Sequence, residues 1–229
     1  MLTSRYAVFK TTFYGLLLFI FLFTLLKYTG INPLKRLDAL QVFWGTLLSE
    51  TYNFYKTIPV LTIAFLLWIR APRPIYLFMH LNTIQKITNY YYRQLVAFLI
   101  VIAFSWTLVL LILSQMLIIN PENISFSLIL SGTYILNLAA FLSTLLLFLI
   151  NLSETWGAFI ITVLLYIDQW LYLHTGQSIL FYHGLISSTL ATGINLSTVI
   201  SDTIWNSIII VICYFLNKTF LKIFKPFTL

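Results

Sequence analysis

The stretch QLVAFLIVIAFSWTLVLLILSQMLII, residues 94–119, contains no Asp, Glu, Lys or Arg. A helix needs about 20 mainly apolar residues to cross the hydrocarbon core of a bilayer, and this run exceeds that length. Its apolar residues do not alternate with polar ones, as the residues of a membrane β-strand would. The run therefore predicts a transmembrane α-helix and makes the chain an integral membrane protein.

The composition of the whole chain agrees with this fold class. Of the 229 residues, 60% are hydrophobic and 8% are charged, whereas soluble domains carry about 25% charged residues. The single cysteine, Cys213, excludes a disulfide framework. The net charge of +7 comes from basic residues at the ends of apolar runs, which the positive-inside rule explains better than nucleic-acid binding does. We expect one all-α transmembrane domain, residues 1–229.

Further apolar runs predict six spans in all. The first is expected to be retained, because no small-x-small cleavage site follows it. The second must begin near Ser49, since the residues between Lys56 and Arg70 are too few to cross a core of about 30 Å at about 1.5 Å per residue. The polar segment 174–202 is expected to form short helices dipping into the outer leaflet. The expected spans are 12–26, 49–69, 94–119, 126–150, 156–173 and 203–216.

The basic residues orient these spans. With the N-terminus inside, nine of the 13 Lys and Arg residues fall in inner segments, and the other four lie in the first outer loop. An excess of Lys and Arg marks the cytoplasmic side of a membrane protein. We therefore expect both termini in the cytoplasm. The inner residues are Arg5, Lys10, Arg70, Arg73, Lys86, Arg93, Lys218, Lys222 and Lys225.

The inner loop between the second and third spans, Arg70 to Arg93, reads RAPRPIYLFMHLNTIQKITNYYYR. Pro74 suits the first position of a helix, and Leu77 and Phe78 continue it with apolar side chains. Asn82 begins a pattern that resembles a capping box, which would end this helix and start another. The pattern predicts a short apolar helix on the cytoplasmic side. It either docks on a partner or lies on the membrane surface without one.

Two polar residues fall within the expected spans. Asn137 lies in the fourth, where Gly132, Ala139, Ala140 and Ser143 favour close helix packing. Asp168 lies near the outer end of the fifth, and an acid within a span is by default a functional hypothesis. Both are candidates for a substrate path. The plain alternatives are packing for Asn137 and a place in the membrane interface for Asp168, and no span is expected to offer a buried charge suited to an ion.

Motifs for catalysis are absent from the sequence. It contains no G-x-x-x-x-G-K-[ST] phosphate loop, no H-E-x-x-H and no G-x-S-x-G. His80, His174 and His183 are not at zinc-ligand spacing, and the six acids form no pair for acid–base work. We therefore expect neither an enzyme nor a metal or cofactor site in this chain.

The six spans, the very short inner turn at 151–156 and the stretch WIRAPRPIYLF at 68–78 resemble the ABC-2-type permease subunits of bacterial ABC transporters. In size and loop pattern the chain is most similar to small permeases of peptide or bacteriocin export and immunity systems. The resemblance covers the whole chain. It implies a multi-pass protein of the bacterial plasma membrane that exports an amphipathic peptide or another hydrophobic compound, giving antimicrobial peptide export or immunity.

The resemblance also implies partners. Two permease subunits, identical or homologous, would pack with two cytosolic ATP-binding subunits, which hold ATP and Mg and hydrolyse the ATP. The helix 74–81 would be the coupling helix, seated in a groove of the ATPase, and the segment 174–202 would form part of the outer gate. The implied docking residues are Arg70, Arg73, Pro74, Ile75, Leu77, Phe78, His80 and Leu81.

Two other function classes fit the same architecture. One is the substrate-capturing membrane subunit of a vitamin-type transporter, which also has six helices and about this size. The other is a membrane immunity or scaffolding protein that works without an ATPase.

Overall fold

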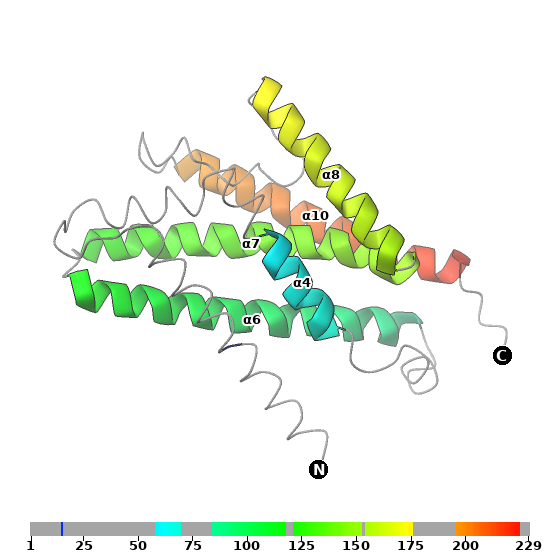
Figure 1. The fold of residues 1–229 in the computed structure, drawn as a ribbon, viewed down its shortest axis with the longest axis horizontal. Helices are drawn as coiled ribbons and strands as arrows, with labels where there is room; N and C mark the ends of the chain where they lie inside the picture. Colours follow the sequence, from blue (N-terminus) through cyan, green and yellow to red (C-terminus); the bar gives the residue numbers. More distant parts are fainter. Residues whose placement is uncertain are drawn as a thin grey trace, which may run out of the picture.

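A computed structural model of the chain describes residues 15, 58–69, 84–117, 121–152, 154–175 and 196–224. Apart from Gly15, these residues form five helices (Figure 1), which confirms the all-α prediction for this part of the chain. The helices are α4 (Ile58–Ile69), α6 (Ile84–Leu117), α7 (Pro121–Asn151), α8 (Glu154–Thr175) and α10 (Leu196–Phe224).

Three of the helices are long and apolar enough to cross a membrane. The apolar stretches are Gln85–Leu108 in α6, Leu128–Asn151 in α7 and Val199–Thr219 in α10. Shorter apolar helices cover Ile58–Ile69 and Phe159–Thr175. Large apolar side chains also cover the outer surfaces of these helices, where water would be an unfavourable neighbour. The chain is therefore a membrane protein, as the composition predicts.

Helix α7 is the centre of the bundle. It packs against α6, α8 and α10, and α4 packs on α6. In Figure 1, α6 runs antiparallel to α7, and α10 runs parallel to it. Helix α8 starts beside the end of α7 and then diverges from it. Nearly every side chain from Asn137 to Leu146 is buried, so α7 forms the core that the other helices enclose.

The close contact of α7 with α10 depends on small residues. Ala140 is fully buried and forms a cluster with Ile209 and Cys213 of α10. Ala139 and Ser143 are buried as well, as the sequence predicts for packing positions. Gly132 differs, because it is exposed and a Cβ atom there would meet nothing within 4 Å. Its lack of a side chain therefore serves no helix contact among the described residues.

Aromatic rings fix α6 against its neighbours. Phe98 packs against Phe65 and Trp68 of α4, with ring centroids 5.1 and 5.8 Å away. Further along α6, Trp106 stacks on Tyr134 of α7 at 5.4 Å and an interplanar angle of 19°. Such pairs contribute about 0.5–1.5 kcal/mol beyond the area they bury.

A glycine allows α8 to start close to α7. A Cβ atom on the buried Gly157 would lie 3.2 Å from the backbone N of Leu149 and the backbone C of Phe148. The turn before it is tight, since Leu152 N–H donates to Phe148 O at 2.8 Å. A larger residue at 157 would have to push against backbone, which cannot move aside as a side chain can.

Helix α6 extends further towards the N-terminus than the predicted span 94–119, and it begins close to the helix start that the Asn82 pattern predicts. The sequence placed residues 84–93 in an inner loop, but they form the first turns of α6, and the helix starts at Ile84. Lys86 and Arg93 extend from its exposed side, while Ile87 and Thr88 are buried. The charges therefore belong to an amphipathic helix start, and the loop before it is shorter than expected.

Helix α10 also begins earlier than predicted. It starts at Leu196, so residues 196–202 extend the last span and are not part of a separate outer segment. The reason is local hydrogen bonding. Thr203 Oγ1 donates to Val199 O at 2.7 Å, and Ser207 Oγ donates to Thr203 O at 2.7 Å. Because the helix itself satisfies these hydroxyls, their polarity does not prevent membrane insertion.

Candidate functional site

The residues predicted to dock on an ATPase lie outside the described part of the chain. They belong to the segment between α4 and α6. They are Arg70, Arg73, Pro74, Ile75, Leu77, Phe78, His80 and Leu81.

The two candidates for a substrate path are both buried but lie on different helices. Asn137, on α7, is 4% exposed, and Asp168, on α8, is 1% exposed. Burial of Asp168 differs from the interfacial position that its neighbours suggested. Asp168 lies in the second half of α8, which diverges from α7, so the structure does not bring the two residues together (Figure 1).

Polar residues that the sequence reading missed line the contact between α7 and α10. We call this set the polar seam. It continues from Asn137 through the C-terminal half of α7 and follows one face of α10. The polar seam consists of Asn137, Thr144 and Asn151 on α7 with Asp202, Asn206, Cys213 and Asn217 on α10.

One end of the polar seam is a hydrogen-bonded network. Asn151 Nδ2 donates to Leu147 O at 2.7 Å and to Asn217 Oδ1 at 3.0 Å. Asn217, which is fully buried, donates from Nδ2 to the hydroxyl of Tyr92 at 3.4 Å. The side chain of Asn217 therefore joins α7, α10 and α6 at a single point.

A second link lies beside this network. Tyr214 OH donates to Asn89 Oδ1 at 2.9 Å, which again connects α10 to α6. The rings of Tyr92 and Tyr214 meet edge to face, with centroids 5.1 Å apart and an interplanar angle of 85°. Together these contacts fix the angle between the first turns of α6 and the last turns of α10.

The middle of the polar seam contains Thr144 of α7 and Cys213 of α10. Thr144 Oγ1 donates to Ala140 O of its own helix at 3.0 Å and lies 3.7 Å from Cys213 Sγ. Cys213 is buried, and its thiol lies beside this hydroxyl. Its place among packed helices indicates a structural thiol, because reactive cysteines need water or a positive environment.

The other end of the polar seam holds the most polar side chains. Asp202 and Asn206 are both 0% exposed. A buried acid in α10 corrects the expectation that no span offers a buried charge, since Asp202 lies within the apolar stretch Val199–Thr219. Among the described residues, neither Oδ1 nor Nδ2 of Asn206 has a hydrogen-bond partner, and the same is true of Asn137 Nδ2.

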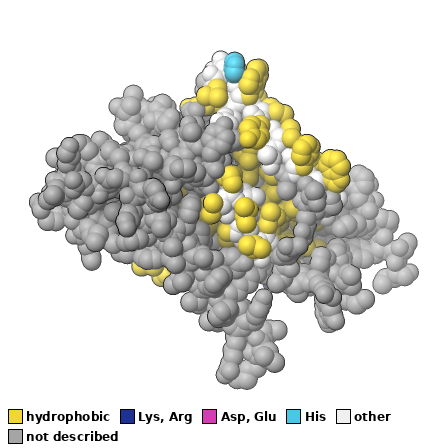
Figure 2. Space-filling model, viewed as in Figure 1, with side chains coloured by type: hydrophobic (Ala, Val, Ile, Leu, Met, Phe, Trp, Pro, Cys, Tyr) yellow, Lys and Arg dark blue, Asp and Glu magenta, His cyan; other side chains and the backbone are white. Residues whose placement is uncertain are grey.

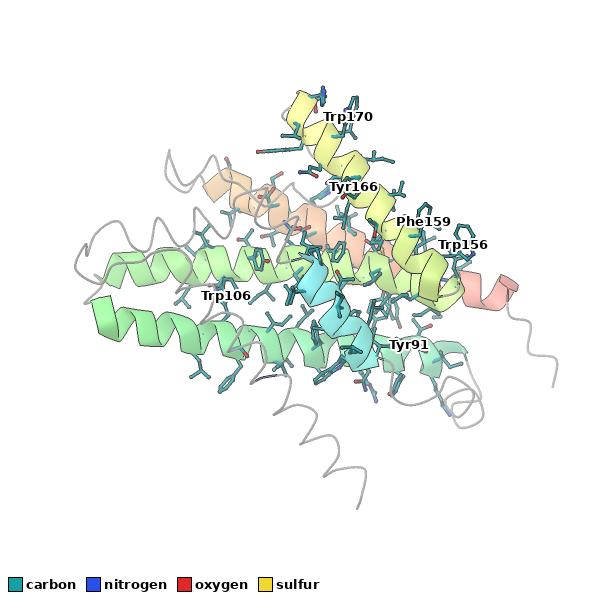
Figure 3. All side chains as sticks on the ribbon, in the orientation of Figure 1. Tyr91, Trp106, Trp156, Phe159, Tyr166 and Trp170 are labelled. Carbon is teal, nitrogen blue, oxygen red and sulfur yellow. The ribbon has the colours of Figure 1, made fainter. Side chains whose placement is uncertain are left out.

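Helix α8 presents a different surface, which is aromatic and exposed. Figure 2 shows hydrophobic side chains along the length of α8. In Figure 3, Trp156, Phe159 and Trp170 lie on the side of α8 that faces away from α7. They are 63%, 58% and 57% exposed, which is normal for a helix surface in contact with lipid. This face therefore carries no hydrogen-bonding chemistry that distinguishes it from a lipid contact.

The described residues of the polar seam offer hydrogen-bonding groups between helices. No group of three His, Cys, Asp or Glu residues within the described ranges is placed to hold a metal ion. Comparison with known protein families, with characterised proteins and with solved structures found no match for this chain. A function proposed for the described bundle must therefore account for the polar seam.

Proposed function

We propose that the chain is the membrane-spanning permease subunit of an ATP-driven exporter of amphipathic peptides or other hydrophobic compounds, serving antimicrobial peptide export or immunity. The observation that supports this most is the polar seam, buried inside helices with apolar outer surfaces. Polar and ionisable side chains inside a membrane cost free energy, and they commonly mark substrate pathways. In this proposal Asn137 and the seam residues of α10 line the path, and Asp168 is a separate polar position on α8.

The proposal includes six spans with both termini in the cytoplasm. All four Lys and Arg residues of the described helices lie near the start of α6 or the end of α10, namely Lys86, Arg93, Lys218 and Lys222. These two helix ends lie at the same end of the bundle (Figure 1). Basic residues gathered at one end support assigning that end to the cytoplasm.

The basic end of the bundle also supports a cytoplasmic position for the docking segment. The docking residues lie between α4 and α6 in the sequence, and α6 begins at the basic end of the bundle (Figure 1). The coupling helix 74–81 would therefore face cytosolic ATP-binding subunits, which bind ATP and Mg. A second permease subunit, identical or homologous, would complete the transporter.

The test is co-purification. The chain is captured from membranes of its native host in a mild detergent, and any co-purifying ATP-binding protein is identified by mass spectrometry. We expect Phe78→Asp to reduce the captured ATP-binding protein at least about tenfold, because a charge replaces an apolar anchor at the interface centre. Thr83→Asp is the matched control, because helical spacing predicts that Thr83 falls with His80 and Lys86 on a more polar side. It adds the same charge there and should leave capture unchanged.

Retention of the ATP-binding protein by Phe78→Asp would rule out the docking role of that segment. Capture of a small molecule with no ATP-binding protein would favour a substrate-capturing subunit. Peptide resistance that persists with an ATPase-dead neighbour would favour an immunity or scaffolding protein. Membrane insertion of each variant is checked by fractionation, so that loss of the protein is not mistaken for loss of docking.

A further inference from the structure

Helices α7 and α10 are in register like the two strands of a parallel coiled coil. Thr144 of α7 faces Cys213 of α10, with Oγ1 and Sγ 3.7 Å apart. One step back along both helices, Ala140 packs with Ile209 in the same buried cluster. Steps of three and four residues on both helices keep such facing positions along one seam.

The next layer of this seam contains two asparagines. Asn137 lies seven residues before Thr144, and Asn206 lies seven residues before Cys213. In a parallel pair of helices, residues one heptad before a facing pair face each other as well. The register therefore sets Asn137 opposite Asn206, in what we call the asparagine layer.

The asparagine layer has hydrogen-bonding capacity that the protein leaves unused. Asn206 is 0% exposed and neither its amide nitrogen nor its amide oxygen has a partner, while Asn137 is 4% exposed and its Nδ2 has none. A buried polar group without a hydrogen bond costs about 1–3 kcal/mol. Three such atoms in one layer call for a ligand that can both donate and accept hydrogen bonds.

We propose that the asparagine layer is a hydration site, which binds water between α7 and α10. A buried water makes about two to four hydrogen bonds and is held by polar atoms of opposite kinds. Asn206 supplies both a donor and an acceptor, and Asn137 supplies a second donor. A bare metal ion fits less well, because the free amide nitrogens are donors that repel a cation.

The site lies deep in the membrane. Asn137 is nine residues from Leu128 and 14 from Asn151, the two ends of the apolar stretch of α7. These separations correspond to about 14 Å and about 21 Å at about 1.5 Å per residue. Water in this layer therefore sits within the hydrocarbon depth of the bilayer. This hydration site does not require an ATPase partner. It places polar groups and water partway across the membrane-spanning bundle.

The single cysteine of the chain makes this testable. Cys213→Ala gives a chain without thiols, into which Asn206→Cys is introduced. The full chain is reconstituted in liposomes and treated with 2-aminoethyl methanethiosulfonate. The thiolate attacks the reagent to form a mixed disulfide and release methanesulfinate, and the thiolate forms only where water solvates it. The rate constant is followed by mass spectrometry of the intact protein.

The control variants carry their cysteine in the neighbouring layer of the polar seam. Ile209→Cys places a thiol in the packed layer with Ala140, which is one turn away on the same face. We expect Asn206→Cys to react at least about tenfold faster than Ile209→Cys, because only the hydrated thiol ionises readily. Asn137→Cys, compared with Ala140→Cys, repeats the test from α7 and keeps it informative if Asn206→Cys fails to fold.

Equal rates in the asparagine layer and in the control layer would overturn the proposal. That result would mean that the two amides pair directly in a dry seam. A fast reaction at Asn206→Cys or Asn137→Cys with slow controls would establish the hydration site, whether or not the chain binds an ATPase.

Discussion

Loss of the Asn217 side chain should uncouple three helices at once. Asn217 is fully buried and bridges Asn151 of α7 at 3.0 Å and Tyr92 of α6 at 3.4 Å. The second distance exceeds the usual range of about 2.7–3.2 Å, so the bond to Asn151 should carry most of the energy. We expect Asn217→Ala to lower the free energy of unfolding by about 1–3 kcal/mol, since it breaks both bonds at a fully buried position.

A double-mutant cycle isolates the bond itself. Asn151→Ala also breaks the bond to Leu147 O at 2.7 Å, but this contribution cancels in the cycle because it lies within α7. Interhelical hydrogen bonds in membrane proteins average about 0.6 kcal/mol and reach about 1.7 kcal/mol. We therefore expect a coupling free energy of about 0.6–1.7 kcal/mol between Asn151→Ala and Asn217→Ala.

The assay is unfolding in mixed micelles by increasing mole fraction of sodium dodecyl sulfate, followed by circular dichroism. Thr219→Ala is the matched control on α10, since Thr219 is exposed and donates only to Phe215 O of its own helix at 3.0 Å. Its coupling to Asn151→Ala should be zero. A coupling of the Asn151–Asn217 pair no larger than this control would refute the register of α7 and α10 at this end of the bundle.

Two further stability predictions compare matched positions in the same assay. Gly157→Ala should destabilise the protein by about 1–2 kcal/mol net, because overpacking against backbone at 3.2 Å outweighs the gain in helix propensity. Gly132→Ala meets nothing within 4 Å and should stabilise it by about 0.5–1 kcal/mol; equal effects at both glycines would contradict the close start of α8. Phe65→Ala should cost about 3–5 kcal/mol, since Phe65 is fully buried against α6. Phe104→Ala removes a ring that is 67% exposed and should change the stability far less, and a similar loss at both would show that burial does not decide the cost.

The helices themselves could be predicted from the sequence, because long runs of apolar residues leave the backbone no partner but its own carbonyls in a membrane. The uncharged run 94–119 falls mostly in α6, and the predicted fifth span 156–173 lies within α8. For α6 and α8, the length of the apolar run alone predicts the helix.

The starts of α6 and α10 could not be predicted in the same way. The uncharged run begins at Gln94, yet α6 continues through Arg93, which is exposed on a helix whose opposite side is buried. Hydroxyls were taken to end the last span at Thr203, yet Thr203 donates to its own helix. In both cases the number of polar residues does not predict where the helix starts, because the start depends on which side of the helix carries them.

Only part of the polar seam was identified from the sequence. Asn137 was noticed because it interrupts an apolar run among small residues. Asp202, Asn206 and Asn217 were not, because each was read with its polar neighbours and not with the residues three or four positions away. Their spacing along α10, together with Cys213, places them on one face, and that periodicity was the signal that could have revealed them.

The parallel pairing of α7 and α10 can be measured most directly with the native cysteine. Thr144→Cys places a second thiol where Oγ1 now lies 3.7 Å from Cys213 Sγ. Oxidation by copper phenanthroline in air should join the two thiols within one chain, seen as a loss of two hydrogen masses and as faster migration without reductant. Thr133→Cys, three turns earlier on α7, should stay reduced under the same conditions. No disulfide at Thr144→Cys, or equal yields at both positions, would contradict the polar seam on which this account rests.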